Sequence, residues 1–512
     1  HVRVYRNGLI YPSAVPSDKP SSIPSNAPSV FPSSRPTLQP SSRPSSKPSR
    51  SPSVAPSVFP SSLPSLQPSS RPSSSSRPSV QPSSRPSNKP AQWNQMGDDI
   101  DGEAADDNSG YSVSLSIDGN IVAIGAFGND ANGSNSGHVR VYTFDSTSFQ
   151  WNQKGSDIGG EAADDESGFS VSLSGDGNIV AIAARYNDGN GSNSGHVRVY
   201  SFDATSSPQW NQIGADIDGE AVNDRSGWRV SLSGDGNIIA VGARGNDGGG
   251  SNSGHVRVYS FDATSSPPQW NQMGGDINGQ AVNDLSGTSV SLSSDGNIVA
   301  IGAPGNDGSA TDSGHVRVYS FDATFAQWNK MGSNINGEGR WDNGGEHATS
   351  VSLSGDGNIV AFGAHNNDGA GNNSGHVRVY SFDATSSPPR WNQMGADING
   401  EAAGDNSGSS VSLSSDGNTL AIGARNNDGN GSNSGHVRVY SFDATSSPQW
   451  NQMGVDINGE AANDNSGVSV SLSSDGNTLA FGAPFNDANG SNSGHVRVYR
   501  NGLIYPSAVP SD

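Results

Sequence analysis

A segment of about sixty residues recurs seven times between Trp93 and Tyr499, and this repetition constrains the fold more than any single residue does. The shared pattern runs from Trp-Asn through Ser-Val-Ser-Leu-Ser, Asp-Gly-Asn and an apolar stretch to His-Val-Arg-Val-Tyr. One unit alone could not bury its apolar face, so seven near-identical units favour a closed ring. The recurring marks are Trp93, Trp151, Trp210, Trp270, Trp328, Trp391 and Trp450, with His138, His196, His255, His315, His376, His436 and His495.

Alternation of apolar and polar residues predicts four strands in each unit. In the first unit Tyr111–Ser116 alternates, and Asp118-Gly119 is a tight-turn signal between it and the apolar run Ile121–Ala126. The third strand is expected at His138–Phe144 and the fourth at Gln150–Ile158. Four antiparallel strands repeated seven times predict an all-β, seven-bladed β-propeller.

The ends of the repeat region indicate how the ring closes. The seventh unit stops after His495–Tyr499, with no Trp-bearing strand behind it, whereas Trp93–Ile100 precedes the first complete unit. We therefore expect the amino-terminal strand to complete the last blade, and we assign residues 91–500 to the propeller.

These residues resemble the FG-GAP repeat of integrin alpha-subunit propellers. Ser109–Tyr142 and Ser466–Tyr499 show the pattern well, and the second retains the triplet Gly482-Ala483-Pro484. The resemblance implies a propeller, and it implies calcium in those members whose Asp-Gly turns hold several acidic residues. Here the neighbours are serines, so we expect hairpin turns without metal at Asp118, Asp176, Asp235, Asp295, Asp356, Asp416 and Asp475.

Residues 19–90 have a different composition. Their repeating Pro-Ser-x-x pattern has too little apolar surface to repay ordering, so a disordered linker is expected, similar to Ser/Pro-rich linkers of algal cell-wall proteins. Residues 1–18 are identical to residues 495–512. We therefore interpret 1–18 as the end of a preceding propeller unit and 501–512 as the start of a further linker, so tandem propellers are expected.

Charge divides along the same boundary. Residues 1–90 carry eleven Lys or Arg against one acidic residue, a net charge of +10. The remainder carries 17 basic and 48 acidic residues, a net charge of −31, and the two sum to the −21 of the whole chain. An acidic ring argues against nucleic acid as a partner. The chain has no cysteine and no apolar run long enough for a transmembrane helix. Ser/Pro linkers beside FG-GAP-like rings favour an extracellular, cell-surface or cell-wall location.

Alternating strand direction places two sets of loops on one face of the ring, here called the loop face. The acidic loops (98–107 and its equivalents) precede the first strand of each blade, and the Asn-Asp loops (129–137 and its equivalents) join the second and third strands. Carboxylates and amides suit calcium, or a glycan held by hydrogen bonds. Alternatively, the aspartates close Asx turns. The candidate ligand residues are Asp130, Asp188, Asp247, Asp307, Asp368, Asp428 and Asp487.

Other repeated residues admit structural interpretations. The seven histidines fall one to a blade, too far apart to share an ion, and the seven tryptophans suit outer-strand packing. Asn-x-Ser sequons in the Asn-Asp loops are glycosylation acceptors if the chain is secreted; they lie at Asn132, Asn190, Asn372, Asn430 and Asn489.

The fifth repeat departs from the consensus. Its acidic loop contains Arg340, Trp341 and His347, and its Asn-Asp loop opens with His365. Both loops are expected on the same rim, where these four residues would form a mixed aromatic, basic and imidazole cluster. Drift in a single repeat is the alternative explanation.

No triad spacing, phosphate loop or metalloprotease motif appears, and the ring offers nearly the same groups seven times, so no enzyme activity is predicted. The sequence favours a recognition and adhesion module that binds a glycan or protein ligand on the loop face, with calcium as the cofactor to test. The first alternative is a structural wall or matrix protein whose basic Ser/Pro linker binds anionic polymer or mineral. The second is a propeller hydrolase.

Overall fold

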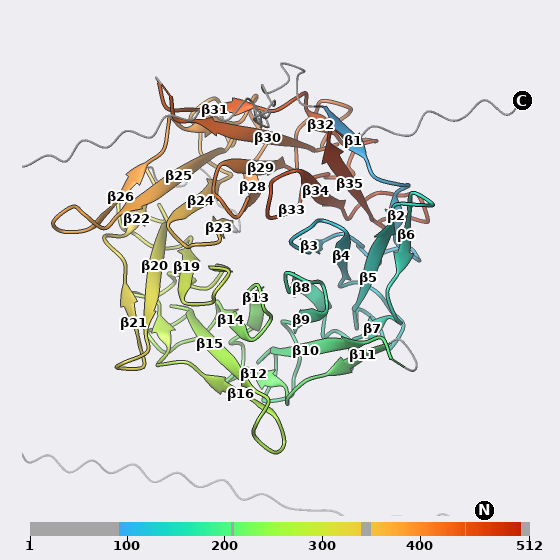
Figure 1. Ribbon diagram of the computed structural model, residues 1–512, viewed down its shortest axis with the longest axis horizontal. Helices are drawn as coiled ribbons and strands as arrows, with labels where there is room; N and C mark the ends of the chain where they lie inside the picture. Colours follow the sequence, from blue (N-terminus) through green and yellow to red (C-terminus); the bar gives the residue numbers. More distant parts are fainter. Residues whose placement is uncertain (1–91, 206–208, 339–349, 446, 503–512) are drawn as a thin grey trace, which may run out of the picture. The chain divides into compact units, whose positions relative to one another are not determined.

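The computed structural model describes residues 92–205, 209–338, 350–445 and 447–502. Within these ranges the strands form seven antiparallel sheets around a common axis, each with five strands (Figure 1). The predicted all-β, seven-bladed propeller is therefore confirmed. The described residues contain no helix with the length and hydrophobicity that a membrane span requires. Residues 1–18 and 19–90, and most of 501–512, lie outside the described residues.

Each blade runs from an inner strand near the axis to a divided outer strand. From the inside outward, blade 1 holds β3 (Ser112–Leu115), β4 (Ile121–Ala126), β5 (His138–Asp145), β6 (Gln150–Gln153) and β7 (Ile158–Gly159); blade 2 holds β8 (Ser167–Leu173), β9 (Ile179–Ala184), β10 (His196–Asp203), β11 (Gln209–Gln212) and β12 (Ile217–Asp218). Blade 3 holds β13 (Ser226–Leu232), β14 (Ile238–Ala243), β15 (His255–Asp262), β16 (Gln269–Gln272) and β17 (Ile277–Asn278); blade 4 holds β18 (Ser289–Leu292), β19 (Ile298–Ala303), β20 (His315–Asp322), β21 (Gln327–Lys330) and β22 (Ile335–Asn336). Blade 5 holds β23 (Val351–Leu353), β24 (Ile359–Ala364), β25 (His376–Asp383), β26 (Arg390–Gln393) and β27 (Ile398–Asn399); blade 6 holds β28 (Ser407–Leu413), β29 (Thr419–Ala424), β30 (His436–Asp443), β31 (Gln449–Gln452) and β32 (Ile457–Asn458). Blade 7 holds β33 (Ser469–Leu472), β34 (Thr478–Ala483), β35 (His495–Asn501), β1 (Trp93–Gln95) and β2 (Ile100–Asp101).

The outer strand is divided in two, which differs from the single strand predicted at Gln150–Ile158. In blade 1 both β6 and β7 pair with β5, and four residues lie between them outside either strand. Gly155 within this gap has a φ of 77°, a left-handed conformation that ends a strand and that glycine adopts without strain. The gap between β6 and β7 contains Asp157, whose carboxylate lies near His138 of β5.

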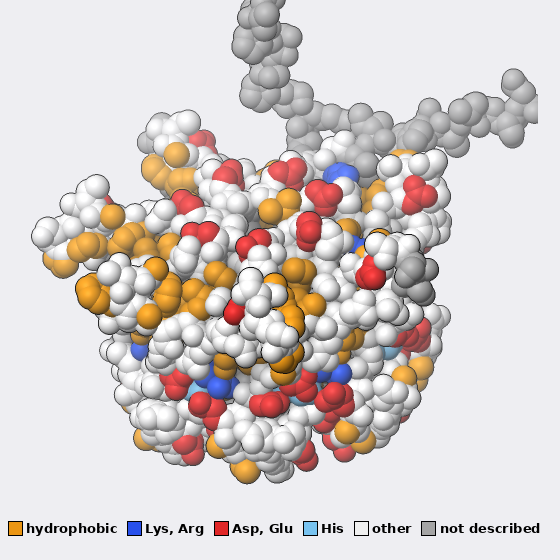
Figure 2. Space-filling view, turned by 60° about the horizontal axis from the view of Figure 1, so that its bottom comes forward, with side chains coloured by type: hydrophobic (Ala, Val, Ile, Leu, Met, Phe, Trp, Pro, Cys, Tyr) orange, Lys and Arg blue, Asp and Glu red, His pale blue; other side chains and the backbone are white. Residues whose placement is uncertain are grey.

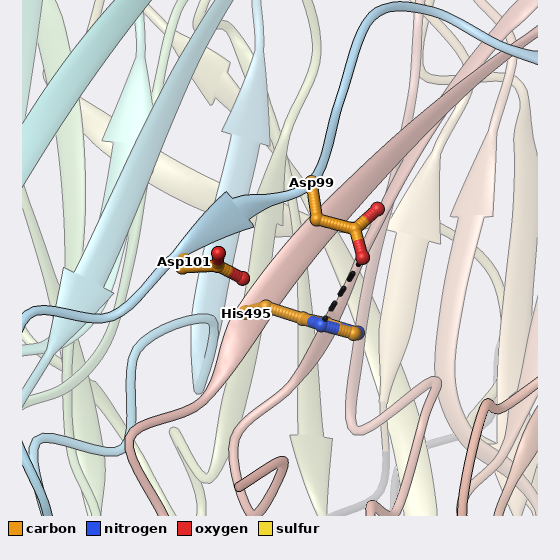
Figure 3. A group of neighbouring side chains, drawn as sticks. All are labelled: Asp99, Asp101 and His495. Carbon is orange, nitrogen blue, oxygen red and sulfur yellow. Dashed lines mark ion pairs between the residues drawn. The ribbon is translucent and has the colours of Figure 1, made fainter. Parts of the chain in front are cut away.

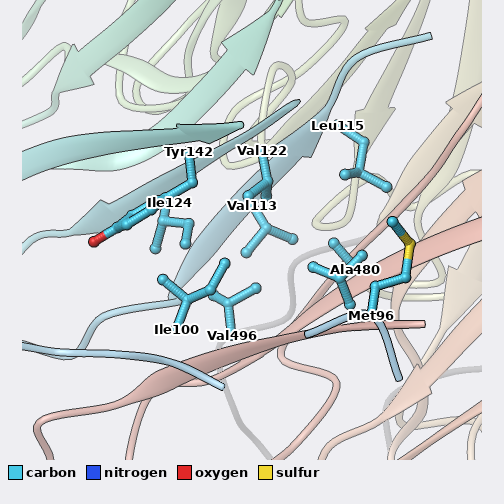
Figure 4. Close-up of a cluster of buried hydrophobic side chains, with 10 residues drawn as sticks. Met96, Ile100, Val113, Leu115, Val122, Ile124, Tyr142, Ala480 and Val496 are labelled. Carbon is cyan, nitrogen blue, oxygen red and sulfur yellow. The ribbon is translucent and has the colours of Figure 1, made fainter. Parts of the chain in front are cut away.

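The amino-terminal strand completes the last blade, as the sequence predicts. Strand β1 pairs antiparallel with β35, placing Trp93 opposite Asn501 and Gln95 opposite Tyr499. Apolar side chains of blades 7 and 1 then pack together at this closing interface, including Ile100, Val113 and Val496 (Figure 4). The two ends of the propeller are thus held by both a strand ladder and a shared core.

The hydrophobic core lies between blades rather than within them. Val139 and Val141 of blade 1 pack with Val171, Leu173 and Val180 of blade 2, and comparable clusters occur at the other interfaces. Burying a side chain of this size contributes about 1.5 to 3 kcal/mol. A blade therefore gains most of its stability from its neighbours.

Serine hydroxyls of one inner strand accept hydrogen bonds from the free edge of the next. In the first interface Ser112 Oγ accepts from the Val171 N–H and Ser114 Oγ from the Leu173 N–H, both at 3.0 Å. The serines of Ser-Val-Ser-Leu are thus acceptors for the next blade, while Val113 and Leu115 enter the core.

A closed ring of backbone hydrogen bonds adds to these contacts near the axis. Each N–H donates to the carbonyl of the next residue in the series at 2.8 to 2.9 Å, and the seventh returns to the first. The described residues in this ring are Ile117, Gly175, Gly234, Ser294, Gly355, Ser415 and Ser474.

Tryptophan indoles connect the blades at the outer rim. The Trp151 Nε1–H donates to the Met96 carbonyl at 2.7 Å, and Trp151 also contacts Phe144 of its own blade with ring centroids 5.2 Å apart. The same bond to the preceding blade recurs at Trp93, Trp210, Trp270, Trp328, Trp391 and Trp450. The predicted outer-strand packing role of the tryptophans is confirmed.

We predict that Ser114→Ala destabilises the propeller by about 1 to 3 kcal/mol, because the Leu173 N–H loses its acceptor at a partly buried strand edge. Thermal denaturation followed by circular dichroism measures the change. Ser146→Ala, in the exposed turn after β5, is the matched control. Equal melting temperatures for the two variants would contradict the role assigned to the hydroxyl.

Candidate functional site

The loop face is held together by bonds between its two loop sets. The acidic loop entering blade 2 donates from Asp164 N to Ser134 O at 2.7 Å and from Glu166 N to Asn135 O at 3.0 Å. The two carbonyls belong to the Asn-Asp loop of blade 1. The expectation that both loop sets share one face is therefore confirmed.

The seven candidate aspartates of the Asn-Asp loops are exposed, and each lies in a different blade. One carboxylate oxygen of each accepts the backbone N–H five residues further along, as from Asp130 to Asn135 at 2.8 Å. This geometry supports the turn-closing interpretation for that oxygen. The same bond occurs at Asp188, Asp247, Asp307, Asp368, Asp428 and Asp487.

Four of the sequon asparagines hold neighbouring loops. The Asn132 side-chain amide donates to the Gly160 carbonyl at 2.8 Å, which belongs to the acidic loop of the next blade. Equivalent bonds are made by Asn190, Asn430 and Asn489. A glycan on one of these nitrogens would therefore replace a loop contact.

The fifth-repeat cluster cannot be assembled from the described residues, because Arg340, Trp341 and His347 lie outside them. His365 is described and is only 4% exposed. Its backbone carbonyl accepts from the Asn406 amide at 3.0 Å. His365 is thus covered by neighbouring residues rather than displayed on the rim.

The Asp-Gly turns are closed by their own residues. Asp118 Oδ1 accepts from the Ser116 hydroxyl at 2.6 Å, and Oδ2 accepts from the Asn120 side-chain amide at 2.8 Å. Partial burial opposes ionisation, but these hydrogen bonds from Ser116 and Asn120 outweigh it and hold the pKa of Asp118 below its usual value. The carboxylate is therefore occupied as a turn acceptor.

Blades 1 to 3 carry an aromatic–arginine cluster that the sequence analysis missed. Its members lie at the loop-face ends of the first two strands of each blade, either at the start of the first strand or directly after the second. They are Tyr111, Phe127, Phe169, Arg185, Trp228, Arg229 and Arg244. The available signal was the residue after the Ser-Gly at or just before the start of a unit's first strand, which is aromatic in these three units but Thr288, Ser409 and Val468 in other units.

The cluster is a continuous stack across three blades. The Tyr111 and Phe169 ring centroids lie 5.0 Å apart. The Arg185 guanidinium lies 3.4 Å from the Phe169 centroid and 4.6 Å from that of Trp228, and the Arg244 guanidinium lies 3.9 Å from the Trp228 centroid. Cation–π contacts of this kind contribute about 0.5 to 2 kcal/mol each.

Arg229 breaks the serine pattern of the inner strands. The equivalent Ser170 accepts from the Val230 N–H at 3.2 Å, whereas Arg229 has no hydroxyl to offer Val290. Instead, its guanidinium lies 5.3 Å from the Phe169 centroid. One contact between blades is thus exchanged for a half-buried cation in the cluster.

A second arrangement recurs around the histidine at the start of each third strand. His138 is 2% exposed, and its Nδ1 lies 3.9 Å from Glu103 Oε2, while Asp157 completes a group of three. Glu103 comes from the loop that enters the blade, and Asp157 comes from the gap in the outer strand. Sequence spacing did not reveal these partners, although it correctly separated the histidines from one another.

We call these groups the carboxylate–histidine clusters. Among the described residues, four are Glu103/His138/Asp157, Glu161/His196/Asp216, Glu220/His255/Asp276 and Glu338/His376/Asp397. In blade 6, Glu401 lies 3.9 Å from His436 and Asp456 acts on its charge, and in blade 7 His495 has Asp99, Asp101 and Glu460 around it. In the last of these, the Asp99 carboxylate faces the His495 ring, with Oδ2 3.6 Å from Nδ1 and Asp101 beside them (Figure 3). The space-filling view shows blue and pale-blue side chains with carboxylates around them (Figure 2).

The fourth blade has the same shape without the charge. Gln280 and Asn334 replace the two acids around His315, and the Asn334 amide approaches His315 Nδ1 at 3.4 Å. Lys330 Nζ donates to Asn334 Oδ1 at 2.8 Å. This blade is therefore a neutral counterpart of the other six.

Burial and the nearby arginine favour neutral histidines. Desolvation and then Arg257 lower the pKa of His255 to about 4, despite the opposing charge of Asp276. In the fourth blade, desolvation, Arg317 and Lys330 lower the pKa of His315 to about 3. Both imidazoles are therefore uncharged at neutral pH.

Comparison with known proteins identifies the repeat. The FG-GAP repeat profile matches residues 100–144, 159–200, 215–259 and 399–440. The chain contains FG-GAP repeats. The profile described as the PT disordered repeat matches residues 39–75 of the FG-GAP chain, within the Ser/Pro-rich region. A search among curated proteins gave no match.

Solved structures similar to the FG-GAP chain are distant. A periplasmic gluconolactonase of Pseudomonas aeruginosa has 16% identity and a TM-score of 0.44, covering 68% of this chain and 86% of that one. Candidate 6-phosphogluconolactonases of Bacteroides uniformis and Bacteroides fragilis have 13% and 11% identity and TM-scores of 0.44 and 0.45; they cover 71% and 70% of this chain and 89% and 86% of their own. Likeness at this level carries no argument about activity.

We predict that His315 makes the FG-GAP propeller less stable in acid. Since the folded pKa is about 3 and the ordinary value is 6.5, the unfolded chain binds one more proton between these limits, and the free energy of unfolding falls as pH falls from 6.5 toward 3. At pH 5 this loss is about 2 kcal/mol. The charged groups facing the ring are Arg317 and Lys330.

Urea denaturation at pH 7 and pH 5 measures this effect. His315→Gln should lose less stability between the two pH values than the wild type, because glutamine does not titrate. Equal losses in the two proteins would show that folding does not lower the pKa of His315.

Proposed function

We propose that the FG-GAP propeller is an extracellular or cell-wall recognition and adhesion module that binds a glycan or protein ligand on its loop face, without catalysis. FG-GAP repeats beside a Ser/Pro-rich repeat region support this type of protein. The nearly uniform set of groups in the seven units argues against the unlike acids and bases that a propeller active site gathers.

The aromatic–arginine cluster is the observation that carries the proposal. A ring kept only for its shape has no need of Tyr111, Phe169 and Trp228 in three adjacent blades, where other blades have small residues. Phe169 and Trp228 are buried and form the base, while Tyr111, Arg185 and Arg229 are half-buried and complete the surface. Ligand contact with this sector accounts for both the aromatic residues and the lost serine.

An acidic glycan fits the chemistry of the cluster best. Aromatic faces contact the apolar faces of sugar rings, and arginine pairs with carboxylate or sulfate groups through two parallel hydrogen bonds. Arg185 is already paired with Glu166 at 2.7 Å, so Arg229 is the better candidate for the ligand anion. The seven candidate aspartates, Asp130 among them, remain proposed positions for calcium beside the ligand.

Avidity is the proposed use of the linker. Propellers joined in tandem by Ser/Pro-rich segments would add weak contacts along one polymer or cell surface. Tight binding by one ring is therefore not required.

The test measures binding of the full chain to immobilised acidic and neutral polysaccharides, first in calcium and then in chelator. We expect binding to acidic glycans, and we expect Trp228→Thr and Arg229→Ser to weaken it about tenfold each, in line with the loss of one cation–π or charged contact. Both replacements occur naturally at equivalent positions in other blades, so the fold should tolerate them.

Arg425→Ala, at the blade 6 position equivalent to Arg185, is the control and should leave binding unchanged. Binding that survives both cluster variants but disappears when residues 19–90 are deleted would overturn the proposal. That result would favour the structural alternative, in which the basic linker holds anionic polymer or mineral.

A further inference from the structure

We propose that the carboxylate–histidine clusters are binding sites for a divalent transition-metal ion, best matched by Zn²⁺, in six blades of the described propeller. Each site would use one glutamate oxygen, one aspartate oxygen and the histidine Nδ1. The proposal does not depend on the ligand-binding function above.

The carboxylate oxygens that would bind the ion are those that do not already accept from a neighbouring arginine or glutamine. In blade 2, Arg198 Nη1 lies 3.3 Å from Glu161 Oε1, and Gln212 Nε2 donates to Asp216 Oδ1 at 2.6 Å. The second oxygens, Glu161 Oε2 and Asp216 Oδ2, each lie 3.8 Å from His196 Nδ1. The arginine and glutamine thus orient the carboxylates so that three acceptor atoms converge.

The spacing suits an ion between them. Two atoms each about 2.1 Å from a tetrahedral zinc lie about 3.4 Å apart. The measured separations between Nδ1 and a carboxylate oxygen are 3.6 to 3.9 Å, so small rotations of the exposed carboxylates would close the shell. In the clusters of blades 1, 2, 3 and 5 all three ligand atoms lie within 4.8 Å of one another, and the same holds for Asp99, Asp101 and His495 in blade 7.

Direct hydrogen bonding does not explain the arrangement. A histidine N–H bonded to a carboxylate would lie about 2.7 to 3.2 Å from the oxygen, which is shorter than any of these distances. His138 and His495 are 2% and 0% exposed, and both ring nitrogens of each have no hydrogen-bond partner among the described residues. A buried imidazole that faces two carboxylates without a hydrogen bond to either has the donor arrangement of a metal-binding site.

The donor types favour a transition metal over calcium. Imidazole nitrogen suits Zn²⁺ and similar ions, while calcium takes six or more oxygens. Three protein ligands leave a position for water, and the glutamate is about half exposed, at 45 to 46% in blades 1 and 2, so an ion can reach the buried histidine.

The fourth blade provides an internal comparison. Gln280 and Asn334 keep the shape of the acids around His315 but replace both charges, and Lys330 supplies a cation of its own nearby. The proposal therefore excludes this blade and predicts that restoring the two acids would create a site.

The test is equilibrium dialysis of the full chain against Zn²⁺, with bound zinc measured by mass spectrometry. We expect about six ions per chain, one for each cluster. Asp216→Asn should remove one ion, whereas Asp203→Asn, at the opposite end of β10 from His196, should remove none. Circular dichroism melting confirms that each variant is folded.

A gain of binding separates the site from general attraction to an acidic protein. Gln280→Glu combined with Asn334→Asp should bind one ion more than the wild type. Gln209→Glu combined with Gln449→Glu adds the same charge at exposed outer strands and should bind no more. The proposal is overturned if the wild type binds no zinc, if Asp216→Asn retains full binding, or if the two charge-matched variants bind equally.

Discussion

Hydrogen bonding between the inner strands is the constraint on which the rest of the propeller depends. An inner strand has one paired edge and one free edge, and a free edge without partners would leave buried N–H groups unsatisfied. Here Ser112 and Ser114 serve the next blade, and the backbone ring that begins at Ile117 returns to itself. Because this ring closes only when every blade is present, each unit is committed to the same spacing and tilt.

Close approach near the axis also explains the small residues of the repeat. A Cβ added to Gly125 would lie 2.0 Å from the Gly168 carbonyl oxygen, so the two blades touch through backbone at this point. The outer rim can take larger groups, and there the tryptophans bridge the wider gap. Size therefore rises from serine and glycine at the axis, through valine and leucine, to tryptophan at the edge.

The strands and the closure could be predicted from the sequence because they depend on local patterns. Tyr111–Ser116 alternates, Asp118-Gly119 turns, and the extra strand at Trp93 has only one blade to join. The carboxylate–histidine clusters could not, since Glu103 and His138 lie 35 residues apart and meet only through ring geometry. The divided outer strand, which positions Asp157, depends on the φ of Gly155. For Asp130 the sequence allowed both a ligand-binding and a turn-closing role, and the structure shows one of its oxygens closing a turn.

Symmetry makes departures from the repeat informative when they occur in sets. In the fourth blade Gln280 and Asn334 stand where other blades have acids, and Lys330 stands where they have an uncharged residue. This joint change is expected if the lysine supplies the positive charge that an ion supplies elsewhere. A single substitution would have left either an unpaired acid or an unpaired amine beside a buried imidazole. In the other blades the same position is filled by two carboxylates with one arginine, which leaves net negative charge against a ring nitrogen. An ion bound there would join three separate chain segments, from the entering loop, the third strand and the outer strand gap. Since it would bind only the folded ring, its binding free energy would add to the stability of the six blades that contain these clusters.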